Sequence, residues 1–461
     1  MEKKIKFFVL CLILVATIAS CSKAENITEV SSITEALTDK TTKAKGNQIS
    51  IYIPQNSHLI TSVINDFNSK NKNHSIVASE FDSWTKEEET RTKITTALMA
   101  GEGPDIIFEY NALFPSLKKM FESGAFCDLN NLIEKDTEFK LSDYNQTVLD
   151  SGIVNGKRYV LPISYRIPSL WTTKNILDKN GIHIDASKWT WKDFFTEAKK
   201  FTNKHNKENK YFIGNYFEPQ YIMGDICSEL VDYENKKTKF TSSEFIDFLK
   251  NYKAISASIC SSDQLWKQDE IINCLESNSI IITSTEGYID PYDVYALNSV
   301  LKQELGEEVF LLNNPSLDNR LLKSAYPVEM LGINSNCKSK EKAFEFIKLL
   351  LSEENQSGEL PSIPVNIKGY TNVVDSYTAI GMRGDRVGYF LSNVNAESVP
   401  LPAQVAKNMD EVISNINTCN IADPRIAEIA SAEVTEYLKS NRSAEDTAKI
   451  IDEKVMLYLN E

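Results

Sequence analysis

The sequence predicts an α/β fold in which the chain passes between two domains. Residues 48–108 alternate segments with strand-like and helix-like hydrophobic periodicity. Residues 154–192 contain an extended run that is interrupted by a proline and followed by two helical segments. The 461 residues, 42% apolar and 25% charged, allow two to three domains with ample cores and exclude wholesale disorder.

Residues 48–108 are expected to form a β-α-β-α-β unit with a largely parallel sheet. The expected elements are strands at residues 48–53, 75–81 and 106–108, and helices at residues 58–68 and 87–100. Ligands bind beyond the carboxyl ends of such strands. This rule points to residues 55–56, 82–84 and 109–111.

Residues 154–192 are expected to hold the crossing between the two domains. Asn155-Gly156 is a tight-turn dipeptide, because Gly takes positive φ readily. The β-rich run after it ends at Pro162, which cannot donate to a central ladder, and residues 164–173 resume as a second extended run. We therefore expect the chain to leave one domain and enter the other at Pro162.

Helix-end signals follow this crossing. Gly181 closes a short helix at residues 175–180 as its C′ residue, and Thr190 is an N-cap that opens an amphipathic helix at residues 191–201. Near the end of the chain, two amphipathic helices are expected as packing elements, at residues 424–439 and 444–459.

The N-terminus carries the strongest local signal. Lys3, Lys4 and Lys6 precede an uncharged run at residues 7–18, which is short for a transmembrane helix and fits a signal-peptide core. The next residues complete the sequence IASC, which resembles the bacterial lipobox, so we expect cleavage before Cys21 and lipidation of its thiol. The alternative is an ordinary secretory signal that contains a cysteine. Residues 21–47 are expected to form a flexible tether.

Charge and cysteine spacing limit the other classes of function. The net charge of −14 argues against a nucleic-acid partner. Six cysteines remain beyond the signal and the lipid site, and their wide spacing leaves both disulfides and buried free thiols open. The four histidines lack metal-ligand spacing, so we expect no metal and no cofactor. The chain also lacks a nucleophile elbow, a phosphate loop and an HExxH motif, and no catalytic residue is expected.

Ordered motifs run through the mature chain. The first is KITTALMAGEGPDIIFEY at residues 93–110, and the second is VNGKRYVLPIS at residues 154–164. Further motifs follow at residues 189–194, 218–221, 279–288, 331–334, 340–356 and 443–451. In their order and spacing these motifs resemble those of family 1 extracellular solute-binding proteins, the group that contains maltodextrin-binding protein.

The resemblance implies an α/β, two-lobed, periplasmic-binding-protein-like fold of type II. Hinge crossings are expected near residues 162–166, 311–315 and 358–364. A solute would bind in the cleft between the lobes, which close over it. The implied organisation is a signal peptide at 1–20, a tether at 21–47, an N-terminal lobe at 48–162 plus 312–358, and a C-terminal lobe at 163–311 plus 359–461.

Strand ends and the resemblance together supply candidate ligand-binding residues. In this family aromatic faces stack on sugar rings, while carboxylate, amide and arginine groups bond to hydroxyls. The candidates are Asn56, Trp84, Glu109, Tyr110, Arg166, Gln220, Tyr221, Tyr288 and Glu329. Ala427 and Glu428 stand where the maltodextrin group has an aromatic pair, so a ligand smaller or more polar than a long maltodextrin is expected.

Some side chains have a structural alternative. Arg166 either pairs with an acid across the hinge or holds an anionic ligand in a bidentate bond. Trp191 is expected in the core of a lobe, whereas Trp171 and Trp266 are left open between core and cleft.

The expected function is that of a lipid-anchored substrate-binding protein of an ABC importer, on the extracellular face of the cytoplasmic membrane. It would bind a mono- or oligosaccharide as a monomer, deliver it to the permease subunits and perform no chemistry itself. Two alternatives remain. One is a secreted glycoside hydrolase with two catalytic carboxylates. The other is a surface scaffold or adhesion lipoprotein on the same fold.

Overall fold

The computed structural model describes most of the chain from residue 47 onward. The described residues are 47–55, 57–81, 87–110, 113–114, 116–205, 208, 210–214, 216–261, 271–284, 290–358, 362–379, 386–388 and 395–461. The predictions made for Cys21, Asn56, Trp84, Trp266 and Tyr288 lie outside these ranges.

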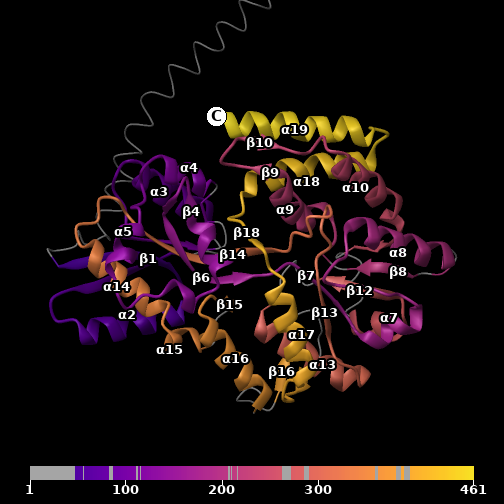
Figure 1. Cartoon of the computed structure of the whole chain (residues 1–461), viewed down its shortest axis with the longest axis horizontal. Coiled ribbons are helices and arrows are strands. Elements are labelled where there is room, and N and C mark those ends of the chain that lie inside the picture. Colours follow the sequence, from indigo (N-terminus) through magenta and orange to yellow (C-terminus); the bar gives the residue numbers. More distant parts are fainter. Residues whose placement is uncertain are drawn as a thin grey trace, which may run out of the picture.

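A mixed sheet forms the centre of the first lobe, at the left of Figure 1. Its order is β15-β6-β14-β3-β1-β2, and β18 pairs with β14. The strands are β1 (Gln48–Pro54), β2 (Ser75–Phe81), β3 (Ile106–Tyr110), β6 (Val160–Arg166), β14 (Ser324–Ile333), β15 (Ile363–Pro364) and β18 (Thr418–Cys419). β1 runs parallel to β2 and β3, which confirms the predicted β-α-β-α-β unit, whereas β14 is antiparallel to β3 and β6.

A second sheet forms the centre of the other lobe, at the right of Figure 1. Its order is β11-β8-β12-β7-β13. The strands are β7 (Ser169–Thr172), β8 (Tyr211–Gly214), β11 (Ile259–Cys260), β12 (Ile280–Ser284) and β13 (Phe310–Asn313). β8 is parallel to β11 and β12, and β7 is antiparallel to β12 and β13. The predicted two-lobed α/β class is thus confirmed.

Helices surround both sheets (Figure 1). They are α2 (His58–Lys70), α3 (Glu87–Met99), α4 (Leu117–Glu122), α5 (Asn130–Lys135), α6 (Gln146–Leu149), α7 (Lys174–Asn180), α8 (Trp191–Lys204), α9 (Pro219–Leu230), α10 (Ser243–Ala254), α12 (Ile271–Glu276), α13 (Pro291–Leu305), α14 (Lys340–Leu350), α15 (Glu353–Gln356), α16 (Ile367–Ala379), α17 (Ala403–Ser414), α18 (Pro424–Lys439) and α19 (Ala444–Asn460). Short strands are β4 (Ile153–Val154), β5 (Lys157–Arg158), β9 (Val231–Asp232), β10 (Lys237–Thr238), β16 (Arg386–Gly388) and β17 (Asn395–Glu397).

Two predicted helix ends are confirmed. The Thr190 hydroxyl accepts the backbone N–H of Asp193, and the Asp193 carboxylate accepts the backbone N–H of Thr190, which completes a capping box at the start of α8. Gly181 follows α7 with φ of 67°, a left-handed conformation that glycine adopts without a Cβ clash.

The first crossing lies later in the chain than predicted. Pro162 lies inside β6 and pairs with Met330 of β14. On the other edge of β6, β15 pairs only with residues 164–165, so the missing N–H of Pro162 removes no ladder bond there. The chain leaves the first sheet after Arg166, the last residue of the range 162–166 predicted for this hinge, so only the boundary set at Pro162 itself is wrong.

The other two lobe boundaries shift in the same direction. β13 belongs to the second sheet and ends at Asn313, so the boundary predicted after residue 311 falls inside a strand. β15 pairs with β6 of the first sheet, so the boundary predicted after residue 358 comes too early. The strands therefore put crossings at residues 167–168, at residues 314–323 and after Pro364, and β18 returns the chain to the first sheet at Thr418–Cys419, inside the segment predicted for the C-terminal lobe.

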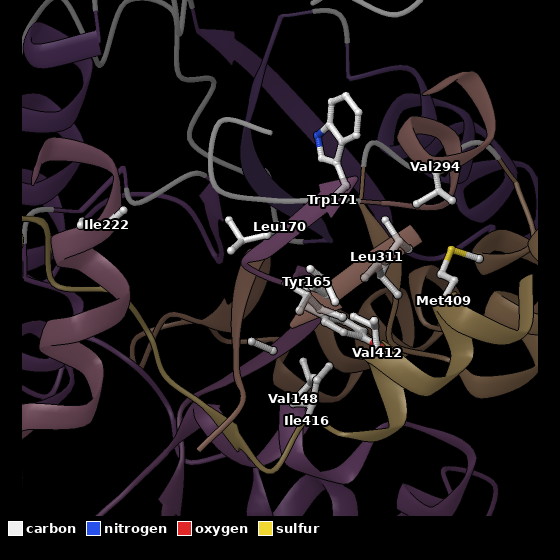
Figure 2. Close-up of a cluster of buried hydrophobic side chains, with 14 of the residues drawn as sticks. Val148, Tyr165, Leu170, Trp171, Ile222, Val294, Leu311, Met409, Val412 and Ile416 are labelled. Carbon is white, nitrogen blue, oxygen red and sulfur yellow. The ribbon is translucent and has the colours of Figure 1, made fainter. Parts of the chain in front are cut away.

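Apolar side chains pack together where the sheets meet (Figure 2). One buried cluster joins Tyr165 of β6, Trp171 of β7, Leu311 of β13 and Met409 of α17. The sequence left Trp171 open between core and cleft. Its side chain is 0% exposed, so it belongs to the core. Trp191 is 2% exposed, so its prediction as a core residue is confirmed.

Helix α17 covers the outer edge of β13, and its Asn408 pairs with the backbone of that edge. Asn408 Oδ1 accepts the N–H of Leu311 at 2.7 Å, and Asn408 Nδ2 donates to the Leu311 carbonyl at 3.2 Å. The amide thus replaces the neighbouring strand that this edge lacks.

We expect Asn408→Ala to lower the free energy of unfolding by about 3 kcal/mol, because the buried N–H and C=O of Leu311 would lose their partner. Urea unfolding followed by circular dichroism measures this change. Gln404→Ala, on the exposed face of the same helix, is the control and should stay within about 0.5 kcal/mol of the parent. Equal losses in the two variants would contradict the role assigned to Asn408.

Candidate functional site

The strands of the first lobe bring together three of the predicted ligand-binding residues. Glu329 of β14 lies opposite Tyr110 of β3 and opposite Ser164 of β6, while Arg166 ends β6. Ser164 Oγ donates to Glu329 Oε2 at 2.9 Å. The register of β14 on β6 shifts on both sides of Glu329, and such bulges redirect side chains next to binding sites.

Arg166 influences carboxyl groups of both lobes. Glu329 is 7% exposed, and burial raises its pKa while Ser164 and the charge of Arg166 oppose the rise. In the second lobe, Asp290 caps α13 and accepts the N–H of Asp293 at 2.9 Å. Burial raises the pKa of Asp290 to about 6, again against the charge of Arg166. The charge of Arg166 thus acts on one acid of each lobe, as the alternative in which it balances acids across the hinge requires.

The second lobe contributes an aromatic surface near the crossing. Tyr221, in the first turn of α9, is 37% exposed and meets the ring of Tyr216 edge-on at 4.8 Å between centroids. Tyr216 is buried and has φ of 48°, a left-handed conformation that is strained for an aromatic residue. Both rings line a small hollow that also includes Pro168, Asp225 and Asn314.

Asp225 is a residue of this hollow that the sequence analysis missed. Its Oδ2 accepts from Asn314 Nδ2 at 3.0 Å, and its Oδ1 accepts from the hydroxyl of Tyr326 at 3.0 Å. Burial raises its pKa, and these hydrogen bonds lower it in part. The i, i+4 spacing from Tyr221 to Asp225 was the available signal, because it puts both side chains on one face of α9. The partners of Asp225, however, come from distant parts of the chain.

Glu109 faces the interior of the first lobe. Its neighbour Tyr110 lies on the opposite face of β3, because side chains alternate along a strand. Glu109 is 1% exposed, its Oε2 accepts the N–H of Phe114 at 3.2 Å, and burial raises its pKa to about 8. The carboxyl therefore positions the chain after β3, and this geometry does not support the expectation that Glu109 binds a solute.

The remaining candidates divide into two groups. Gln220 is exposed beside Tyr221 at the start of α9. Asn56, Trp84 and Tyr288 lie outside the described residues; in the sequence they follow β1, β2 and β12.

Cysteine, metal and membrane features were also open questions. Within the described residues, the six cysteines are unpaired, and no group of three or more His, Cys, Asp or Glu side chains is placed to hold a metal ion. No helix in the described part of the chain combines the length and hydropathy needed to span a bilayer.

Comparison with known proteins identifies the family. The sequence profile of the bacterial extracellular solute-binding proteins matches residues 55–357, which is more than half of the chain. This chain belongs to that family.

Solved structures of sugar-binding proteins share the fold. An oligogalacturonide-binding protein from Yersinia enterocolitica aligns with a TM-score of 0.65 at 15% identity, over 90% of this chain and 99% of that one. The sugar-binding protein MalE from Xanthomonas citri gives a TM-score of 0.64 at 13% identity, over 90% and 98%. An ABC substrate-binding protein from Listeria monocytogenes, in complex with cycloalternan, gives 0.58 at 17% identity, over 90% and 100%.

We expect Glu109→Gln to flatten the dependence of stability on pH between about pH 5 and pH 8. The pKa of Glu109 is raised from 4.5 to about 8, so in this range the folded chain holds a proton that the unfolded chain has released. The stabilisation that Glu109 contributes is complete below pH 4.5 and is lost as the pH rises through 8. Over this range the free energy of unfolding falls by at most about 1.4 kcal/mol per pH unit.

Urea unfolding of both proteins at intervals from pH 5 to pH 9 tests this expectation. Glutamine keeps a side-chain oxygen for the N–H of Phe114, so the difference between the curves isolates the titration. Curves that stay parallel over the whole range would show that the pKa of Glu109 is not raised.

Proposed function

We propose that this chain binds a short carbohydrate in the cleft between its lobes and serves as the substrate-binding protein of an ABC importer. The observation that carries the proposal is the partly exposed ring of Tyr221 beside hydrogen-bonding carboxyl and amide groups at the crossing of a two-lobed solute-binding fold. Aromatic faces and polar groups in such a hollow are the combination that recognises sugar rings. The sugar-binding proteins of the same fold support the choice of ligand class.

In this proposal the two lobes contact the solute from opposite sides. Tyr221 and Gln220 contribute from the second lobe, and Tyr110 and Glu329 from the first. The candidates Asn56, Trp84 and Tyr288 belong to the same proposal, because they adjoin strand ends of the two sheets.

We also propose that the chain performs no chemistry on its ligand. Asp225 is held by Asn314 and Tyr326, and Glu329 by Ser164. Carboxyls fixed by protein donors suit recognition of hydroxyls, and transport energy would come from the ATPase subunits of the importer. Ligand binding and lobe closure would form one linked equilibrium.

Anchoring forms the last part of the proposal. Lipidation of Cys21 would hold the monomeric protein on the extracellular face of the cytoplasmic membrane, and residues 22–47 would tether it.

Cys21→Ser should release the protein from the membrane fraction of a bacterial host that processes lipoproteins. Incorporation of labelled fatty acid is the direct readout, with Cys127→Ser as the matched control that keeps its label. Equal labelling of the Cys21→Ser variant and the parent would exclude Cys21 as the anchor.

Tyr221→Ala should weaken solute binding about tenfold or more and leave the melting temperature of the free protein unchanged, because the ring packs on the surface. The solute is first found by a thermal-shift screen of the mature chain against sugars, with amino acids, polyamines and anions as comparison sets. A ligand at a hundred times its Kd adds about 2.7 kcal/mol of stability.

The control for this variant is Met99→Ala, an exposed change in the first lobe that should leave affinity as it is. Unchanged affinity in Tyr221→Ala would remove Tyr221 from the site. A hit among anions only would contradict the carbohydrate proposal, and turnover of the bound sugar would contradict the absence of chemistry.

A further inference from the structure

The chain contains two Asn-Gly dipeptides, Asn155-Gly156 and Asn180-Gly181. Asparagine loses its side-chain amide most readily before glycine, because glycine has no side chain to shield its backbone nitrogen from reaction. By sequence the two sites are equivalent. The structure places them in different surroundings, which we compare group by group.

The first dipeptide forms the exposed two-residue turn between β4 and β5 (β4 is labelled in Figure 1). Asn155 has φ of 51° and Gly156 has φ of 75°, the left-handed conformations of a tight hairpin turn. The backbone N–H of Asn155 donates to Glu234 at 3.3 Å, and the carbonyl of Gly156 accepts from Asn130 Nδ2 at 2.9 Å. Among the described residues, no hydrogen bond engages the side chain of Asn155 or the N–H of Gly156.

The second dipeptide ends helix α7, and both of its reacting groups are engaged. Asn180 Nδ2 donates to the carbonyl of Ile176 at 2.8 Å and to Asn278 Oδ1 at 3.1 Å. The backbone N–H of Gly181 donates to the carbonyl of Asp178 at 3.1 Å. The side-chain amide and the backbone nitrogen are thus held in place by separate partners.

We propose that Asn155 is a site of spontaneous deamidation in the folded protein and that Asn180 is protected. The backbone nitrogen of Gly156, after losing its proton to the solvent, attacks the side-chain carbonyl carbon of Asn155. The new carbon–nitrogen bond closes a succinimide ring, and the side-chain nitrogen takes up a proton from the solvent and leaves as ammonia. One water molecule then opens the ring and leaves aspartate or isoaspartate at position 155.

Hydrogen bonding accounts for the difference between the two sites. Attack requires the side-chain carbonyl carbon to reach a backbone nitrogen that is free of a hydrogen bond. At Asn180 this first breaks the bonds to Ile176 and Asn278 and the bond of the Gly181 N–H, so reactive conformers are rare. At Asn155 only rotations within an exposed turn are needed. We expect the rate at Asn155 to exceed that at Asn180 by at least about tenfold in the folded chain.

The reaction would change the contact between two hairpins. Glu234, which follows β9, accepts the backbone N–H of Asn155, so a carboxylate at position 155 would stand close to a like charge. The isoaspartate product would also lengthen the backbone of a turn that the pairing of Val154 with Lys157 closes. Neither effect depends on which solute the protein binds.

Peptide mapping by mass spectrometry, after incubation of the folded mature chain in mildly alkaline buffer, measures the rate at each site. Aspartate and isoaspartate should accumulate at residue 155 at least about tenfold faster than at residue 180. The same incubation in concentrated urea removes the structural difference, so both sites should then convert at similar rates.

Two matched variants assign the product in the folded chain. Asn155→Gln should remove the acidic form that isoelectric focusing detects in the aged protein and that mapping assigns to residue 155, whereas Asn180→Gln should leave this form unchanged. Equal rates at the two sites in the folded chain would overturn the proposal. So would a folded chain in which residue 155 stays intact while both sites convert in urea.

Discussion

The pairing of β14 with both β3 and β6 is the constraint on which the rest of the structure depends. At the start of β14, Tyr326 reaches Asp225 in the other lobe, and at its middle Glu329 meets Ser164. Near its end, Gly332 has no room for a side chain, because a Cβ would lie 2.6 Å from the ring of Phe126 and 2.9 Å from the carbonyl of Tyr159. One strand therefore fixes the hinge, the candidate site and the packing of the first lobe.

The acidic side chains near the crossings are enclosed and hydrogen-bonded, an arrangement that suits ligand binding. Asp225, Glu329 and Asp290 are each largely enclosed, which raises the pKa of each, and each accepts a hydrogen bond from a protein donor. Arg166 lies among them as the balancing charge for two of the three.

Local sequence signals were sufficient to predict most of the helices and strands. The cap at Thr190 and the left-handed Gly181 define α8 and α7, and the bounds of α18 match the periodicity of residues 424–439. Ordered motifs were sufficient for the family, although each motif alone is weak.

Features that depend on tertiary pairing were not accessible from the sequence. Pro162 was predicted to end a strand. β6 accommodates this proline because β15 pairs with β6 only at residues 164–165, and this pairing cannot be read from the sequence. Asp225 was missed because its partners, Asn314 and Tyr326, lie 89 and 101 residues away. Glu109 was placed in the site by position in the motif, whereas the alternation of side chains along β3 turns it inward.

The central claim is that one solute contacts both lobes at the crossing. Hydrogen–deuterium exchange with and without the sugar that most stabilises the chain tests it most directly. We predict that protection rises together at the start of α9, near Tyr221, and in β14, near Glu329. Protection confined to one lobe, or to the outer surface around Lys302 and Gln404, would contradict it.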